Sequence, residues 1–276
     1  IHANAWDRCR EEAILREVRR GRRALQVLYG TFITAHSGPD NGFCYPLTEP
    51  LIQNQSVICA QMSWQGGGNI RHSRIIPPGI SPDMFLSQIF ADLLPALAAP
   101  LGRYCDNQPV ALLFEADTSM SSQRVRELWG DAWQKSGIRQ PLEYIEGHGL
   151  SAIDYWLDNR IRENTLLLVV ALQIAPENPD GTAEAVTALL LGNRLTQNVL
   201  APYALLHRPE QGTANTLAEN IAQAMDWGPV QPEEVHHVWR TGLSASGQRA
   251  VAALNGLSPL QGAQYDLDTT LGQAGR

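Results

Sequence analysis

Hydrophobic positions follow helical spacing in the first part of the chain and give way to loop-forming stretches soon afterwards. Apolar residues recur at near-helical intervals among Arg and Glu over residues 5–29, which predicts one long helix. Residues 36–56 and 65–82 are rich in Gly, Pro, Asn and Ser, so both are expected to be irregular loops. Between them, residues 57–64 alternate in the manner of a strand. The chain is therefore expected to open with a helix and two long loops.

From residue 82 onward the pattern predicts alternating strands and helices. Ser81 is a good N-cap residue and Pro82 suits the first helical position, so a helix is expected from there to about Ala98. The other expected helices are 121–136, 150–163, 216–227 and 246–254, and the expected strands are 109–115, 142–146, 165–174, 183–192, 202–208 and 235–241. Repeated β-α units of this kind predict an α/β fold with a mainly parallel, mixed sheet covered by helices.

Two segments of this pattern carry further information about the sheet. The strand at 165–174 is the most apolar in the chain, which is typical of a central strand buried on both faces. The strands at 183–192 and 202–208 have no helix between them, so they are expected to form an antiparallel excursion.

Composition narrows the class of protein. The 276 residues are 44% hydrophobic and 18% charged, which excludes a disordered chain. The net charge of -7 argues against a nucleic-acid partner. No apolar run reaches the ~18 residues of a membrane span. A cytoplasmic location is expected, and because the chain begins at Ile1, a signal or membrane tether upstream of that residue stays an option.

The first helix is the most basic stretch of the chain. Its arginines would suit contact with an acidic lipid or partner surface, whereas the interspersed glutamates favour a solvated helix face. The residues concerned are Arg16, Arg19, Arg20, Arg22 and Arg23, with Glu11, Glu12 and Glu17 as counter-charges.

Neither the cysteines nor the glycines predict a bound metal or cofactor. The four cysteines, Cys9, Cys44, Cys59 and Cys105, form no C-x-x-C pair and are expected to be reduced and structural, with two disulfides as the alternative. The glycines at 66–68 precede neither a helix nor a Lys, so a flexible turn is favoured over a phosphate-binding loop.

Three places are candidate sites of chemistry. His148 and Ser151 lie on one turn, so a Ser-His pair would require His148 to fold back, and Ser151 is expected to help cap the following helix. His236 and His237 are adjacent on a predicted strand and point to opposite faces, which disfavours joint metal binding and predicts that one is buried. Residues 117–119 follow a strand end, where ligands often bind, but are expected to form a capping turn.

Three stretches in this order resemble the thiolase-fold superfamily, which contains the β-ketoacyl synthases. They are EYIEGHGLSAI at 143–153, followed by a helix and an apolar strand; DGTAEAVTALLLG at 180–192; and residues 217–240, with Asp268 and a closing glycine turn at 272–275. The resemblance implies a thiolase-like α/β domain over 36–276, preceded by an amphipathic helix and connection at 1–35. It also implies pseudo-halves at about 57–200 and 201–276.

The same resemblance indicates that the catalytic apparatus is missing. The family carries its nucleophilic cysteine in the strand-to-helix turn, where this chain has Gly147-His148-Gly149. The family's two later histidines, or histidine and asparagine, correspond here to Thr241-Gly242-Leu243 and Gly272-Gln273. A non-catalytic binding protein is therefore expected, with no catalytic residue, cofactor or metal.

A shorter resemblance points to the kind of partner. The predicted strand, loop and helix that lead to ALLFEADTSM at 111–120 look like an adaptor family encoded beside lipase effectors of the bacterial type VI secretion system. This implies that the chain binds another protein, such as a secreted effector, and the thiolase resemblance implies a homodimer as a further option. The alternative is an acyl-transfer enzyme or hydrolase with an unusual nucleophile. A pocket that unites Cys44, Cys59 or Cys105 with His148 or His207 would favour it, as would a reactive Ser151.

Overall fold

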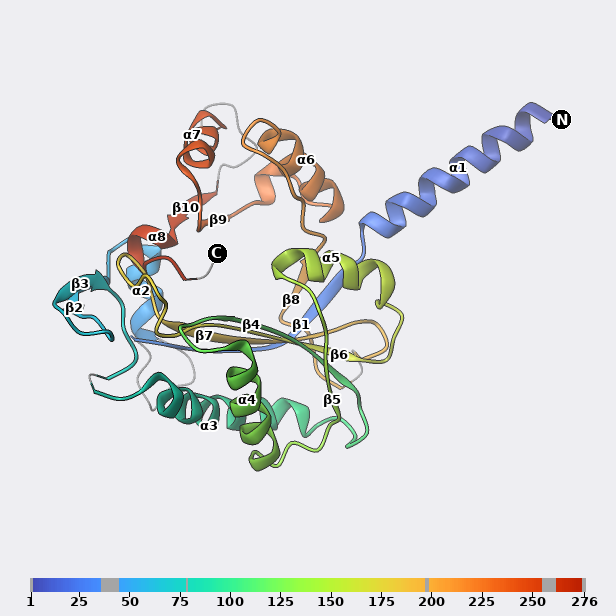
Figure 1. The fold of residues 1–276 in the computed structure, drawn as a ribbon. Coiled ribbons are helices and arrows are strands. Elements are labelled where there is room, and N and C mark those ends of the chain that lie inside the picture. Colours follow the sequence, from blue (N-terminus) through green and yellow to red (C-terminus); the bar gives the residue numbers. More distant parts are fainter. Residues whose placement is uncertain (1, 36–44, 78, 197–198, 255–261, 275–276) are drawn as a thin grey trace.

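A six-stranded mixed sheet lies at the centre of the computed structural model, which describes residues 2–35, 45–77, 79–196, 199–254 and 262–274 (Figure 1). The strand order is β5-β4-β6-β7-β1-β8. The strands are β1 (Ala24–Thr34), β4 (Val110–Asp117), β5 (Leu142–Tyr144), β6 (Leu166–Gln173), β7 (Ala185–Gly192) and β8 (Ala204–His207).

Strand directions divide the sheet into two parts. β4 pairs in parallel with both β5 and β6, which is the part that the β-α alternation predicted. β7 is antiparallel to β6 and β1, and β8 is antiparallel to β1, so four strands run one way and two the other. The expectation of antiparallel strands in this part of the chain is confirmed, because β7 and β8 are each antiparallel to their neighbour β1. They lie on either side of β1, so they run in the same direction and do not pair with each other.

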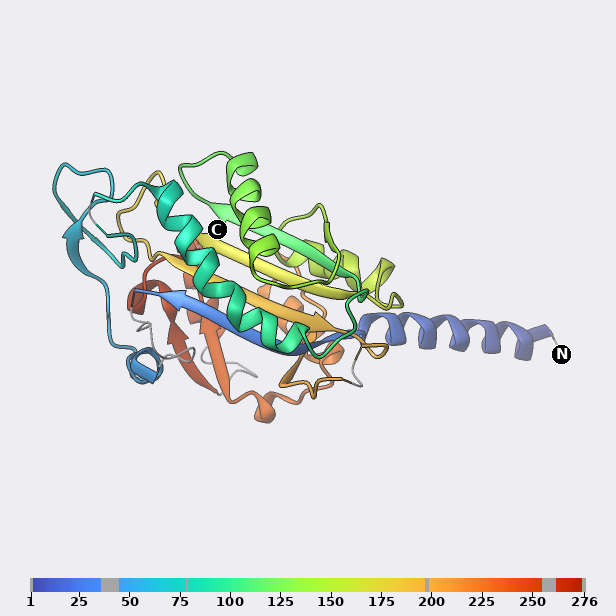
Figure 2. The same ribbon diagram turned by 90° about the horizontal axis from the view of Figure 1, so that it is seen from below.

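Two helices cover one face of the sheet. α3 (Pro82–Leu101) and α4 (Ser122–Lys135) begin at N-cap residues Ser81 and Ser121, whose side chains accept from backbone N–H groups three residues on. Figure 2 shows α3 lying along the strands. Between these helices and β4, the rings of Phe90, Phe114 and Trp129 meet edge to face at 5.2–6.1 Å, which stabilises the layer beyond simple burial.

α3 is also the one helix among the described residues that is long and apolar enough to cross a membrane. Its apolar side chains are, however, buried against the sheet. The buried positions are Leu86, Ile89, Phe90, Leu93, Leu94, Leu97, Pro100 and Leu101. Its composition is therefore that of a core helix.

α5 (Gly149–Asn159) covers the other face of the sheet. Trp156 and Leu157 are 1% and 0% exposed and pack with Leu25, Leu113 and Leu167 from three strands. Since β4 and β6 thereby lose water on both faces, their continuous apolar sequence is explained. The expected central position of β6 is confirmed, because it lies between β4 and β7.

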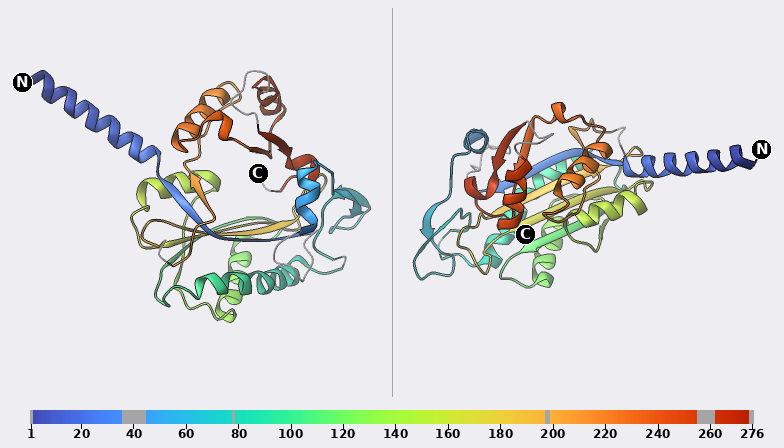
Figure 3. Two further views of the ribbon diagram at one scale, coloured as in Figure 1. Left: turned by 180° about the vertical axis from the view of Figure 1, so that it is seen from behind. Right: turned by 90° about the horizontal axis from the view of Figure 1, so that it is seen from above.

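Smaller elements complete the fold. The segment before α3 holds α2 (Tyr45–Ile52) and the antiparallel pair β2 (Cys59–Met62) and β3 (Asn69–His72). The last part of the chain arches above the sheet on the side of α5 (Figures 1 and 3). It consists of α6 (Leu217–Trp227), η1 (Pro232–Glu234), β9 (His237–Arg240), α7 (Ala245–Leu254), β10 (Ala263–Asp266) and α8 (Leu267–Thr270), with β9 and β10 in parallel.

The structure corrects three predictions in the first third of the chain. The helix predicted over 5–29 ends early, because α1 covers His2–Gly21 and β1 follows it. The predicted loops contain α2 and β3. β1 is an inner strand of the sheet, between β7 and β8. The proposed division between 1–35 and 36–276 would therefore separate β1 from the strands to which it is hydrogen-bonded.

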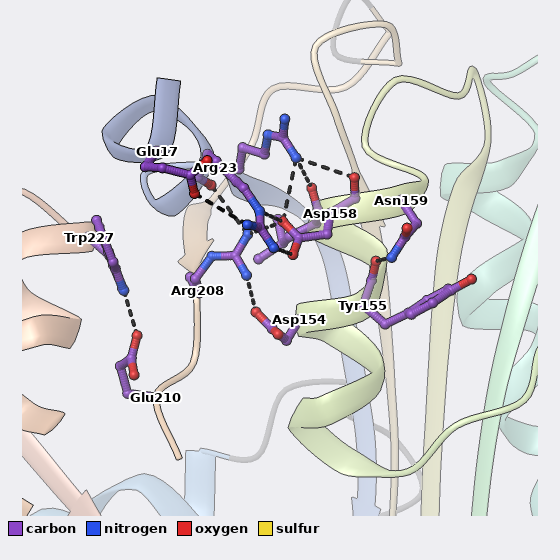
Figure 4. A network of polar contacts seen from close by, with 11 residues as sticks. Glu17, Arg23, Asp154, Tyr155, Asp158, Asn159, Arg208, Glu210 and Trp227 are labelled. Atoms are coloured by element: carbon purple, nitrogen blue, oxygen red, sulfur yellow. Dashed lines mark hydrogen bonds and ion pairs between the residues drawn. The ribbon is translucent and has the colours of Figure 1, made fainter. Parts of the chain in front are cut away.

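α1 projects away from the rest of the molecule (Figures 1 and 2). Trp6 is 79% exposed and Leu15 is 51% exposed. Among the described residues, α1 forms hydrogen bonds with other elements only near its C-terminal end, through a polar network with the end of α5 (Figure 4). Arg20 donates to both carboxylate oxygens of Asp158 at 2.9 and 2.5 Å, and Arg208, which follows β8, donates to the same carboxylate at 2.7 Å.

The network is completed by contacts from neighbouring residues. Arg208 also pairs with Asp154, and Arg23 donates to the carbonyl oxygen of Leu157 at 3.0 Å. The side chain of Asp158 is 18% exposed, so its charge is only partly screened by water. The hydrogen bonds from Arg20, followed by those from Arg208, lower the pKa of Asp158 to about 2.

We predict that Asp158→Asn destabilises the fold in a pH-dependent manner. The ordinary pKa of this carboxyl is 3.8, so its ionisation stabilises the folded state above that pH and the contribution is lost as the pH falls towards about 2. The difference in free energy of unfolding between wild type and variant should be about 2 kcal/mol at pH 6 and should shrink over this window. Urea unfolding at several pH values measures it.

Asp106→Asn is the matched control, because Asp106 forms an ion pair with Arg139 in which both side chains are more than half exposed. It should change stability little at any pH. A difference for Asp158→Asn that stayed constant down to pH 2 would show that the ionisation of Asp158 is not linked to folding.

Candidate functional site

The turn between β5 and α5 has a backbone that only glycines accommodate easily. Gly147 has φ +141° and Gly149 has φ +49°, both in the region that L side chains avoid. A Cβ on Gly147 would lie 2.7 Å from the Cβ of Ala152 in the following helix. Between the glycines, His148 is extended and occupies the N-cap position of α5, but its side chain caps no N–H group.

The first N–H group of α5 is bonded to a carboxylate from another strand. Glu115, near the end of β4, accepts a hydrogen bond from the backbone N–H of Gly149. A negative charge at this position also suits the positive end of the helix dipole. The helix terminus that a condensing enzyme would use to stabilise a thiolate or an oxyanion is thus occupied by the protein's own carboxylate.

Next to this turn lies a cavity of about 500 Å³ at the carboxyl ends of β4 and β6. Apolar lining comes from residues such as Ala171, Leu172 and Ala185, and polar lining from Asp117, Arg126, His148 and Thr187. Ala274, close to the end of the chain, also borders it. The cavity therefore combines an apolar wall with charges of both signs, as ligand and protein-binding sites do.

The segments of the resemblance meet at this end of the sheet. The backbone N–H of Gln273 donates to the carbonyl oxygen of Gly181 at 3.0 Å, and Ala183 N–H donates to Gln273 at 3.0 Å. Gln173, at the end of β6, donates to the carbonyl oxygens of Ala183 and Gln273 at 2.9 and 2.6 Å. The closing turn thus lies beside the start of the 180–192 segment, whereas Gly275 is outside the described residues.

The Ser-His pair, which the sequence disfavoured, does not form. The hydroxyl of Ser151 donates to the backbone carbonyl of its neighbour His148 and not to the imidazole ring. In the part of the chain that the structure describes, the ring of His148 forms no hydrogen bond. Ser151 therefore bonds within the first turn of α5, and the N-terminal N–H group is capped by Glu115 in place of Ser151.

The cysteines do not reach the site in the described part of the chain. Cys9, Cys59 and Cys105 carry free thiols, in agreement with the expected reduced state, and all three are exposed. None of them lines the cavity beside His148. Cys44 lies outside the described residues.

The remaining candidates have structural contacts of their own. His236 and His237 are both exposed, which corrects the expectation that one is buried, and His237 lies 3.2 Å from the hydroxyl of Tyr265. At the end of β4, Thr118 accepts from the N–H of Met120 at 3.4 Å, as expected for a capping turn. Asp117 instead lines the cavity. Among the described residues no cluster of three His, Cys, Asp or Glu side chains could hold a metal ion.

Two acidic residues at this end of the sheet were missed by sequence reasoning. Glu115 was taken as part of the 109–115 strand, with no role of its own. Glu184 is 1% exposed, and its carboxylate accepts from the N–H groups of Ile75, Ile76 and Ala175 at 2.7–3.0 Å. A charged residue at the end of an apolar strand was the available signal, because a buried carboxylate needs partners.

Several solved structures are similar to the chain. AbyA1, a tetronic acid condensing enzyme, matches with a TM-score of 0.50 at 11% identity, over 91% of this chain and 88% of that one. The priming β-ketosynthase of the R1128 polyketide pathway gives 0.48 at 13% identity, over 91% and 84%. OleA of Xanthomonas campestris gives 0.48 at 9% identity, over 91% and 86%.

No protein-family model and no curated protein sequence matches the chain. The match to AbyA1 shows a thiolase-like α/β fold, as the sequence resemblance implied. At 11% identity the match concerns the fold alone. The condensing activity is that of AbyA1.

We predict that Gly147→Ala and Gly149→Val each lower the free energy of unfolding by roughly 1–3 kcal/mol through backbone strain. Gly147→Ala also places its Cβ 2.7 Å from the Cβ of Ala152, which is a steric clash, whereas no atom lies within 4 Å of a Cβ on Gly149. Gly130→Ala is the control, since this glycine lies inside α4 with free space around it and should gain roughly 0.5–1 kcal/mol. Thermal melting measures all three, and a harmless Gly149→Val would contradict the positive φ at this turn.

Proposed function

We propose that the chain is a non-catalytic, thiolase-like adaptor that binds another protein, namely an effector of bacterial type VI secretion. The observation that carries the proposal is the hydrogen bond from Gly149 N–H to Glu115, which occupies the helix terminus needed for condensing chemistry. The described lining of the adjacent cavity also contains no cysteine. The partner class rests on the short sequence resemblance at 111–120.

The exposed side of α5 is the surface that best suits a protein partner. Leu150 and Tyr155 are 61% and 62% exposed, and Tyr144 of β5 is 36% exposed. Together with Trp156 and Arg160, Tyr144 and Tyr155 line a shallow pocket of about 580 Å³. Aromatic and Arg side chains around a pocket are the composition that carries binding energy in protein interfaces.

The adaptor function further implies loading of the effector in the bacterial cytoplasm. The proposal also includes tethering to a membrane and formation of a homodimer. Size-exclusion chromatography with light scattering determines the oligomeric state, and cell fractionation determines the location.

We predict that the full chain forms a stable complex with an effector encoded beside its gene. Tyr155→Ala should weaken the complex by about tenfold or more, because an exposed aromatic side chain in an interface pocket is a typical hot spot. Tyr203→Ala is the matched control, since Tyr203 is 76% exposed and lies away from this pocket. Calorimetric titration of the purified partner measures both variants, and equal affinities for the two would contradict the proposed surface.

The catalytic alternative has its own test. Incubation with acyl-thioester and thiol-reactive probes, followed by mass spectrometry of peptides, should find no acyl group transferred to a serine or cysteine beside the cavity. His148→Ala should leave the fold and partner binding unchanged, because its exposed ring has no hydrogen-bond partner in the described part of the chain. An acyl adduct on Ser151, lost in His148→Ala, would overturn the non-catalytic proposal.

A further inference from the structure

A second cavity, of about 520 Å³, lies at the base of α1 and is lined mainly by arginine side chains. It is bordered by one side of α1 and by the turn that follows α5. Glu12 and Leu15 complete the lining. The five arginines that line it are Arg16, Arg19, Arg20, Arg23 and Arg162.

Two of these arginines already form ion pairs, and three do not. Arg20 and Arg23 both form ion pairs with Asp158. In the described part of the chain, the exposed side chains of Arg16, Arg19 and Arg162 form neither a hydrogen bond nor an ion pair. Glu12 is the only acidic residue in the described lining. The cavity thus carries an excess of positive charge, in a chain whose net charge is -7.

The geometry and charge of this cavity point to an anionic ligand. Guanidinium groups gathered around one cavity repel each other, and an anion between them removes that repulsion. Arg presents N–H donors in a planar fork that matches phosphate oxygens in a bidentate manner. Because Arg20 and Arg23 are held by Asp158, that side of the cavity is ordered before a ligand arrives.

We propose that this cavity binds a phosphate group, which is carried either by an anionic phospholipid or by a free phosphate. This function goes beyond partner binding and does not depend on it. A lipid source would also explain the exposed apolar residues of the same helix, since Trp6 and Ile14 are 79% and 52% exposed. Such side chains can enter the boundary of a bilayer next to bound headgroups.

The test uses the full chain and two probes. Calorimetric titration with inorganic phosphate, against chloride at equal ionic strength, detects a free phosphate ligand. Co-sedimentation with phosphatidylcholine vesicles, with and without phosphatidylglycerol, detects a headgroup. The variant Arg16→Ala, Arg19→Ala, Arg162→Ala should weaken binding by about tenfold or more, because it removes charge-assisted hydrogen bonds.

The control variant Arg8→Ala, Arg10→Ala, Arg103→Ala removes the same charge from residues that do not line the cavity, and should weaken binding by less than about threefold. Binding of phosphate supports a free ligand, and binding of phosphatidylglycerol vesicles alone supports a lipid. Binding of neither probe, or equal losses in both variants, would overturn the proposal. Far-UV circular dichroism verifies folding, and intact binding of the effector would show that the two functions are separate.

Discussion

The fold depends on removing water from both faces of two neighbouring strands. β4 and β6 carry apolar side chains on both faces, so the sheet needs α3 and α4 on one side and α5 on the other. α5 must reach its face within a few residues of the end of β5. This requirement forces the tight turn at Gly147 and Gly149, and it brings the start of α5 next to Glu115. The cavity lies beside this turn, at the carboxyl ends of the same two strands.

Elements with their own local signals could be predicted from the sequence. Ser81 with Pro82 fixed the start of α3, and the uninterrupted apolar run of β6 identified a central strand. The first part of β1 was mistaken for helix because its buried residues Leu25 and Leu28 are spaced by three. A bulge between Val27 and Tyr29 and burial on both faces produce that spacing in a strand, since Leu25 and Leu28 belong to opposite core layers.

The site was located from sequence only in part. The turn around His148 could be placed because glycines flank it between a predicted strand and helix. The role of Glu115 could not, because it depends on the parallel pairing that sets the end of β4 beside the turn. The same holds for Arg20 and Asp158, which are 138 positions apart and meet only in the folded chain. Contacts of this kind leave no periodic signal in the sequence.

The attachment of α1 at one end has a mechanical consequence. Fourteen residues separate Trp6 from Arg20, so at 1.5 Å per residue the exposed indole lies about 20 Å beyond the last fixed contact. A rotation of about 10° at the Arg20–Asp158 pair would carry Trp6 through about 3–4 Å, a displacement comparable to two residues of helical rise. α1 thus acts as a lever whose pivot is the carboxylate of Asp158 in α5. A small rotation of α5 would therefore produce a larger displacement at the N-terminal end of α1.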